Sequence, residues 1–467
     1  MNNLRNFSVR RGASALAVFG FLTTAYAQPP PTVAREVDVC VIGGGSSGTY
    51  AAIKLHDAGL SVAVVERENT LGGHVNTYID PNSKRAIDYG VVAFHSTPLV
   101  KSYFERLDIP YEQDSSFSST TYINLENGQR VDNYTSPNPT AALAKYASIL
   151  SRWPFLDEGF ELPDPVPEDL FQPFGDFVQK HGIEDAVEII YSFAQGLGDV
   201  LRQPTLYVLK SFGSQVLASI KTGFLSTARK NNHEIYEKAL EILQANVFLN
   251  SRILNVRRTP GALTEIVFDT PSGRTVIQAK RLLVTIPPTI QNLGVFDLDE
   301  AEKTLFNKFT NAGYYTGLVR GTGLHNISTI MNVNPSLPYN LPRLPALYFF
   351  QPTPIEGLYG IKYGTPSGLD EAWIKDDIIK TIKRLNGPNS SDTAGNQAEL
   401  VEFASHTPFE LKVQAKDIKE NFYKKLYSLQ SHRDTYYSGA AFHTHDSSLL
   451  WQFTAGIVDR LIESIRV

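Results

Sequence analysis

The clearest pattern of apolar and polar positions lies near the beginning of the chain. An apolar run covers residues 37–42, a segment with helical spacing of apolar residues begins near Ser47, and a second apolar run covers 62–65. Short apolar runs on either side of an amphipathic segment predict a buried strand, a helix and a second parallel strand. We therefore expect a β-α-β unit here.

Three glycines, Gly43, Gly45 and Gly48, occupy the turn between the first strand and the helix. The first permits a tight turn, the second lets the backbone approach a pyrophosphate, and the third allows the helix and strand to pack closely. The helix start at Ser47 offers free N–H groups and partial positive charge to phosphates. Glu66 ends the second strand, where a carboxylate can accept hydrogen bonds from a ribose. Dinucleotide binding explains this pattern better than an ordinary glycine turn, which leaves the acid's position unexplained.

Along the rest of the chain, the spacing of apolar residues alternates between helical and strand-like patterns. Helices are expected over 174–182, 184–195, 205–220, 370–385 and 449–465. Strands are expected over 247–250, 252–256, 264–268, 276–277, 281–286, 346–350 and 435–439. Strands thus return after a helical region, as hairpins at the least.

A second glycine pair follows the acid. Arg67 is followed by Gly72, Gly73 and His74 in one short loop, and such a pair lets the backbone lie close to a ligand. An acid followed by a Gly-Gly-basic loop resembles the FAD-binding signature of the flavin amine oxidase superfamily. Residues 87–94 resemble the segment that this superfamily places beside the isoalloxazine ring. The resemblance implies that the cofactor is FAD rather than NAD.

The resemblance extends over most of residues 36–467 and implies an α/β fold. In this fold a discontinuous, Rossmann-type FAD-binding domain carries an inserted α+β substrate domain. The expected division is a signal peptide at 1–27, FAD-binding parts at 36–94, 241–290 and 431–467, a helical and substrate insertion at 95–240, and a substrate domain at 291–430.

The resemblance also assigns residues in the later FAD-binding parts. Ile253 corresponds to a residue that lies against the adenine in the superfamily. Gly439 ends the last short strand, and Leu449 and Leu450 begin a helix whose N-terminal N–H groups face the pyrimidine edge of the flavin in relatives. Such a helix terminus stabilises negative charge on the reduced ring. Many relatives have an acid after the glycine, whereas this chain has Ala440.

His443 and His445 are the candidate general bases, because they lie close in sequence to the flavin-facing helix. A histidine with a pKa near neutrality suits proton transfer. Both residues are equally consistent with lining a loop or capping the helix. His74 is expected to contact the cofactor. Lys362 matches poorly the lysine that orients a water in amine oxidases.

Three classes of function follow from these observations. The favoured class is an FAD-dependent oxidoreductase that performs two-electron oxidation, or oxidative cyclisation, of an apolar or aromatic small molecule by hydride transfer. Residues 446–451 and the glycine turn resemble the branch of fungal β-cyclopiazonate dehydrogenases, and 174–182 resembles that of bacterial polyunsaturated fatty acid isomerases. A redox-neutral isomerase or a flavin amine oxidase is the alternative. A flavin-free binding protein is disfavoured by the intact glycine pattern.

Absent motifs narrow the chemistry further. The sequence Gly196-Leu197-Gly198 starts a second dinucleotide pattern but lacks its third glycine, which counts against a reductase supplied by NADPH. Cys40 is the only cysteine, so the chain has no internal disulfide, no cysteine-based metal site and no cysteine to tether a flavin. No metal is expected. The net charge of −5 gives no reason to expect nucleic acid or an anionic membrane as a partner. The oligomeric state is left open.

The N-terminal segment predicts export. Three arginines lie within the first 11 residues, an apolar stretch covers 13–24, and a small-x-small cleavage site covers 25–27. This pattern is typical of a secretory signal peptide, and no later apolar run has the length of a transmembrane helix. The protein is therefore expected to be secreted and glycosylated. The mature chain carries N-x-S/T sequons at Asn133, Asn326 and Asn389.

Overall fold

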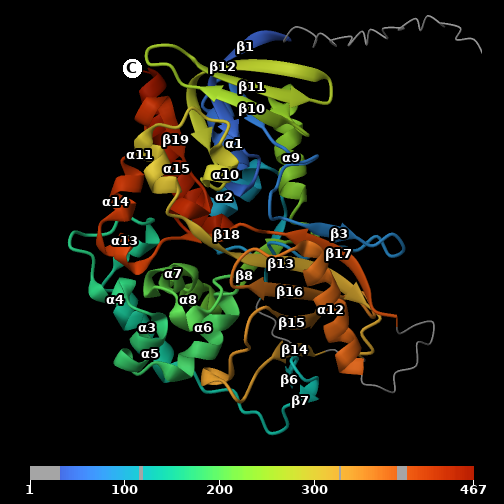
Figure 1. Ribbon diagram of the computed structural model, residues 1–467. Coiled ribbons are helices and arrows are strands. Elements are labelled where there is room, and N and C mark those ends of the chain that lie inside the picture. The colour runs from blue at the N-terminus through green and yellow to red at the C-terminus, as the bar shows by residue number, and fades with distance from the viewer. Residues whose placement is uncertain (1–31, 115–118, 325–327, 387–396, 467) are drawn as a thin grey trace, which may run out of the picture.

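A computed structural model describes residues 32–114, 119–324, 328–386 and 397–466 (Figure 1). The predicted signal peptide at 1–27 and the sequons at Asn326 and Asn389 lie outside the described residues. Asn133 is described and is exposed, with a φ of 61°. Within the described ranges, no helix has both the length and the apolar character needed to cross a membrane.

The first sheet contains the predicted nucleotide-binding unit. Its strand order is β10-β11-β12-β1-β2-β9, and β19 also pairs with β12. The strands are β1 (Thr32–Ile42), β2 (Val62–Val65), β9 (Val247–Phe248), β10 (Arg252–Arg257), β11 (Thr264–Thr270), β12 (Gly273–Val284) and β19 (Thr435–Tyr437). β1 is parallel to both β2 and β12. Three distant parts of the sequence therefore build one sheet, which confirms the discontinuous α/β fold. The domain boundaries themselves stay predictions.

The centre of this sheet is buried on both faces. The apolar runs 39–42 and 62–65 are almost inaccessible to solvent. Helices α1 (Ser46–Asp57) and α15 (Ser447–Arg466) pack together beside it. Continuous apolar strands are typical of parallel sheets covered by helices. Each buried aliphatic side chain contributes about 1.5–3 kcal/mol.

A second sheet lies below the first in the view of Figure 1 and shares that half of the molecule with a group of helices. Its order is β17-β13-β16-β15-β14-β6-β7, and β18 also pairs with β13. The strands are β6 (Thr120–Asn124), β7 (Gln129–Arg130), β13 (Thr310–Arg320), β14 (Thr329–Asn332), β15 (Ala346–Pro352), β16 (Tyr359–Thr365), β17 (Glu399–Ser405) and β18 (Phe409–Lys412). Helix α12 (Glu371–Asn386) packs against it through Ile374, Ile378 and Ile382.

A group of helices from the first insertion lies beside the second sheet (Figure 1). It contains α3 (Thr140–Leu150), α5 (Phe174–His181), α6 (Val187–Phe193), α7 (Thr205–Ser211) and α8 (Ser214–Thr222). The predicted helix at 174–182 is confirmed, with Gly182 as its left-handed cap at φ 59°. The remaining described elements are α2 (Pro98–Arg106), α4 (Glu168–Phe171), α9 (Glu234–Leu243), α10 (Ile290–Leu293), α11 (Glu300–Phe306), α13 (Ala415–Lys419), α14 (Phe422–Tyr427), β3 (Thr77–Ile79), β4 (Ala86–Asp88), β5 (Tyr111–Asp114) and β8 (Phe224–Thr227).

Three sequence-based expectations about elements were wrong. The single helix expected over 205–220 is two helices, because the extended backbone of Gly213 interrupts it. The two short strands expected at 276–277 and 281–286 form one strand, β12. The insertion at 95–240, expected to be a mixture of turns and helices, also supplies β6 and β7 to the second sheet, where β6 pairs with the distant β14 and β7 pairs with β6.

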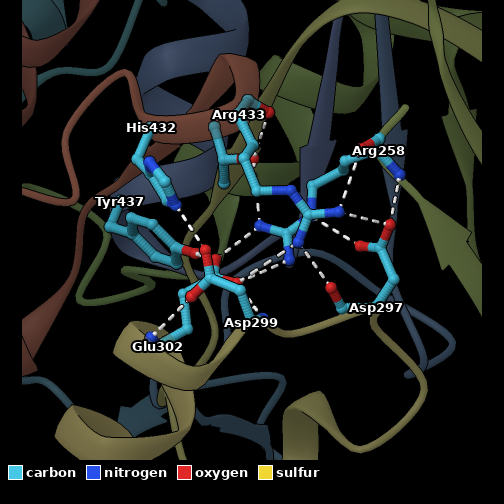
Figure 2. A network of polar contacts seen from close by, with 8 residues as sticks. Arg258, Asp297, Asp299, Glu302, His432, Arg433 and Tyr437 are labelled. Atoms are coloured by element: carbon cyan, nitrogen blue, oxygen red, sulfur yellow. Dashed lines mark hydrogen bonds and ion pairs between the residues drawn. The ribbon is translucent and has the colours of Figure 1, made fainter. Parts of the chain in front are cut away.

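A buried ion network joins α11 to β10 and β19 (Figure 2). The guanidinium of Arg258 donates to both carboxylate oxygens of Glu302, at 2.6 and 2.8 Å, and to Asp297 at 2.9 Å. The hydroxyl of Tyr437 also donates to Glu302, at 2.8 Å, and Arg433 donates to Asp297 at 2.7 Å. The network therefore fixes the end of β19, just before Gly439.

Candidate active site

The two predicted glycine loops lie side by side. The N–H of Gly72 donates to the carbonyl of Gly44 at 2.9 Å, and a Cβ built on Gly73 would lie 3.1 Å from the Cα of Gly45. Gly43 has a φ of 101°, and a Cβ on Gly48 would lie 1.9 Å from the carbonyl oxygen of Gly43. A side chain at either position would therefore strain or block the turn.

The groups around these loops fit a dinucleotide. A Cβ on Gly45 would meet nothing closer than 3.8 Å, so the backbone there is open to a ligand. Helix α1 has no side-chain cap, and the buried Ser47 Oγ has no hydrogen-bond partner among the described residues. Glu66 is buried, and its carboxylate accepts from the N–H groups of Gly44 at 2.6 Å and Glu68 at 2.9 Å. Free N–H donors for a phosphate and a fixed carboxylate for a ribose thus lie together at the ends of β1 and β2.

Thr285 ties the last FAD-binding segment to the glycine turn. Its hydroxyl lies 2.9 Å from the carbonyl oxygens of both Ile42 and Gly43. Gly439 has a φ of 109°, and a Cβ there would lie 3.2 Å from the carbonyl oxygen of Thr285. Sequence reasoning missed Thr285, because only the pairing of β12 with β1 brings it to the turn.

The other predicted cofactor residues have varied surroundings. Leu449 and Leu450 are buried in the first turn of α15, and both of their N–H groups donate to Asp446, so their contact with the cofactor stays a prediction. Ile253 lies on β10 opposite Phe268 and is half-buried. Arg67 is exposed and pairs with the exposed Glu68 at 3.0 Å, and its charge contributes to the lowered pKa of His74 beside the second glycine loop. Its role with FAD stays a prediction.

Three histidines from distant segments form a stacked cluster, which we call the histidine cluster: His74, His406 and His445. The ring of His74 stacks on His406 with centroids 4.2 Å apart and lies 6.0 Å from His445. His74 directly follows the second glycine loop, so the cluster adjoins the cofactor edge. The predicted segment 87–94 also lies here, because Val91 N donates to the carbonyl of His74 at 3.2 Å.

Aromatic rings cover this cluster. Phe409 stacks on His445 at 3.8 Å, and Tyr314 lies 4.6 Å from Phe409 and 5.9 Å from His406. Burial therefore lowers the pKa of His406 and of His445 well below the usual value, and the neighbouring His74, Lys362 and His445 add to the effect on His406. Burial also lowers the pKa of His74 to about 4. All three rings are neutral near pH 7.

Hydrogen bonds assign different tautomers to His406 and His445. The Nε2 of His445 accepts from the N–H of Glu410 at 2.9 Å, so its proton is on Nδ1. The Nε2 of His406 lies 2.9 Å from Oδ1 of Asn76 and donates to it, so its lone pair is on Nδ1. Within the described part of the chain, no hydrogen bond engages that Nδ1. His406 can thus accept a proton, while His445 can donate a hydrogen bond.

Lys362 on β16 brings a cation close to His406. Burial lowers the pKa of its ammonium to about 8, and its charge contributes to the lowered pKa of His406. Its Nζ lies 5.8 Å from the ring centroid of Phe349. Among the described residues, none forms a hydrogen bond or ion pair with this Nζ. The ammonium is therefore available to a ligand.

His443, the other predicted base, has a different environment. Its ring is buried against Phe453, and its Nε2 donates to the carbonyl of Asp157 at 3.1 Å. Burial lowers its pKa to about 3. The buried Nδ1 of His443 has no hydrogen-bond partner among the described residues, so a role for His443 in proton transfer stays a prediction, whereas His445 belongs to the cluster.

His95 and Asp446 anchor the start of α15. The carboxylate of Asp446 accepts from Leu449 N at 2.9 Å and lies 3.3 Å from Nε2 of the buried His95. Burial would lower the pKa of His95, but this carboxylate outweighs it and raises the pKa. Sequence reasoning found neither this pair nor His406, because no local spacing connects their segments.

Comparison of the chain with known protein families and solved structures agrees with this architecture. Residues 41–107 match the family described as NAD(P)-binding Rossmann-like domain. A fatty acid isomerase from P. acnes has a TM-score of 0.74 at 19% identity, covering 92% of this chain and 99% of that one. Putrescine oxidase bound to putrescine has a TM-score of 0.66 at 16% identity, covering 92% and 100%. These neighbours show that the chain shares its overall fold with the fatty acid isomerase and with putrescine oxidase.

Closer relatives identify the family. The FAD-dependent oxidoreductase oblC of Cochliobolus heterostrophus is 40% identical over 89% of both chains. Beta-cyclopiazonate dehydrogenase of Aspergillus oryzae is 37% identical, covering 93% of this chain and 94% of that one. The FAD-dependent oxidoreductase dbaF of Emericella nidulans is 34% identical, covering 92% and 91%. The chain belongs to this family of fungal FAD-dependent oxidoreductases.

Proposed function

We propose that the protein oxidises an apolar or aromatic small molecule of fungal secondary metabolism by two electrons, as a dehydrogenase or an oxidative cyclase. The observation that carries this proposal is the free Nδ1 of His406, which lies in an aromatic surround beside the glycine loops. The relatives named beta-cyclopiazonate dehydrogenase support the substrate class.

FAD, held by the glycine turn, Ser47 and Glu66, supplies the two-electron acceptor when bound. Tyr314 and Phe409 position the apolar body of the substrate and exclude water. His406 accepts the proton that leaves the substrate at its Nδ1, and Asn76 keeps the ring in the required tautomer. The Nδ1–H of His445 and the ammonium of Lys362 stabilise negative charge that develops nearby.

Anaerobic mixing with candidate substrates, including β-cyclopiazonate, tests the reaction. Oxidation without oxygen leaves the flavin absorbance bleached, because the electrons have no other acceptor. Product formation without lasting bleaching identifies a redox-neutral isomerase instead. Rapid turnover of simple monoamines would favour an amine oxidase.

A His406→Ala variant tests the proton acceptor. Loss of a general base lowers the rate of flavin bleaching by roughly 10²- to 10⁴-fold, with FAD content unchanged. His443→Gln is the matched control and should retain the rate within a few-fold, because the His443 ring is turned to the Asp157 carbonyl. A large loss in the control with none in His406→Ala would assign the base to His443.

We also propose that the protein is secreted. The support is the basic, apolar and small-residue order of residues 1–27 and the exposure of the sequon at Asn133. N-terminal sequencing of protein from the native host should find Gln28 first. Glycosidase treatment should lower the mass of the wild type but not of an Asn133→Gln, Asn326→Gln, Asn389→Gln variant. Intact chain that starts at Met1 inside cells contradicts secretion.

A further inference from the structure

A cavity of about 260 Å³ lies between the helical insertion and one end of the second sheet. We call it the Tyr134 pocket. Its walls come from α6, from β6 and β14, and from the loops around Tyr134 and Tyr339. These elements lie at the opposite end of the molecule from the nucleotide-binding sheet (Figure 1). The pocket is therefore distinct from the site described above.

Tyrosines are the aromatic residues of the pocket walls. Tyr122, Tyr134, Tyr191 and Tyr339 all line it. The rings of Tyr122 and Tyr134 have centroids 4.2 Å apart. Tyrosine faces attract flat apolar rings and also cations, because the π-system carries negative charge on its faces. The pocket thus suits an aromatic ligand.

Charge narrows the class of ligand. The carboxylate of Glu188 lines the pocket and accepts from the hydroxyls of Tyr134 and Ser136, both at 2.6 Å, and of Tyr122 at 3.3 Å. Asp185 is the second carboxylate of the lining. No lysine, arginine or histidine occurs among the described residues that line the pocket. An anionic ligand would meet two uncompensated negative charges, whereas a cation would neutralise one.

An aromatic column leads from the pocket toward the histidine cluster. Tyr191 lies 5.6 Å from Tyr348, Tyr348 lies 6.3 Å from Tyr314, and Tyr314 lies 5.9 Å from His406. The hydroxyl of Tyr191 is buried without a hydrogen-bond partner among the described residues. A buried hydroxyl without a partner costs free energy, so packing or ligand recognition must offset it.

We propose that the Tyr134 pocket is a second small-molecule site, which binds an aromatic molecule that carries a cationic amine. The tyrosine rings hold the aromatic body and Glu188 pairs with the ammonium. The proposal does not depend on the oxidation reaction, because it concerns binding alone.

Three indoles of similar shape test the proposal by calorimetry on the FAD-loaded full chain at pH 7. Tryptamine is a cation, 3-ethylindole is neutral and indole-3-propionate is an anion. Tryptamine should bind most tightly and indole-3-propionate most weakly. Equal affinity for all three, or tightest binding of the anion, in the unmodified protein overturns the proposal.

Variants then locate the site. Glu188→Gln should weaken tryptamine binding roughly tenfold while leaving 3-ethylindole nearly unchanged. Glu184→Gln is the matched control, because this exposed carboxylate lies four residues earlier and does not line the pocket. Ile189→Trp fills the cavity and should abolish binding of all three indoles. Unchanged binding in Ile189→Trp, together with a tryptamine-induced change in the flavin spectrum, would place the ligand at the histidine cluster and overturn the proposal.

Discussion

At the scale of single residues, Glu66 is the sharpest test of the cofactor site. Its carboxylate is buried and already orders the turn through Gly44 N, so Glu66→Ala removes both a turn contact and the acceptor for a ribose. Each lost charged hydrogen bond costs about 1.5–3 kcal/mol, or roughly ten- to a hundredfold in FAD affinity. Flavin content after dialysis measures the loss. Glu68→Ala, at an exposed neighbour, should retain FAD; equal flavin in both variants contradicts the role.

Lys362 gives the site a pH dependence. Its pKa is lowered to about 8, so the ammonium loses its proton as the pH rises through that value. Because the cation stabilises developing negative charge, the rate of flavin bleaching should fall above about pH 8. In the Lys362→Met variant, flavin bleaching should be slower at every pH, and the rate should not fall further above about pH 8. A wild-type rate that stays level from pH 7 to pH 10 excludes the contribution of Lys362.

The residues that could be predicted from the sequence are those whose role depends on local spacing. Gly43, Gly48 and Glu66 belong to one β-α-β unit, so their distance along the chain determines their geometry. His406 comes from a loop between β17 and β18, and its partner Asn76 lies 330 positions earlier. No local pattern can report such a contact. Proximity in sequence also misled, because His443 and His445 are two positions apart but have different surroundings.

At the scale of elements, the network around Glu302 holds α11 against β10 and β19. Glu302→Gln leaves the buried Arg258 without a full counter-charge, and breaking such a pair costs about 3–5 kcal/mol. We expect a clearly lower midpoint of thermal unfolding. Glu300→Gln, exposed on the same helix, should unfold within about 1 °C of the wild type because it has no such role. Similar shifts in both variants would contradict this account.

Elements with continuous apolar runs or glycine caps could be predicted well, as 37–42 and 174–182 show. The strands β6 and β7 at one end of the second sheet could not, because they are short and partly exposed and lack an apolar pattern; β6 pairs with β14, and β7 pairs with β6. Strand formation there depends on tertiary pairing more than on local propensity.

At the scale of the whole molecule, β19 pairs with β12 as the last strand of the first sheet and leads directly to Gly439 and α15. A nascent chain leaves the ribosome with its N-terminus first, so the segment that completes the nucleotide-binding sheet emerges after the glycine loops. A nascent chain that ends at residue 430 should therefore hold no FAD, although its glycine loops are complete. Ribosome-stalled chains can be extended by a C-terminal linker that carries residue 467 out of the ribosomal tunnel. Pull-down with fluorescent FAD should give signal for these chains only. FAD binding by a chain that is exposed only to residue 430 contradicts this order. Cofactor uptake would then act as a checkpoint on the docking of α15, because FAD adds stability only to chains in which this helix is in place.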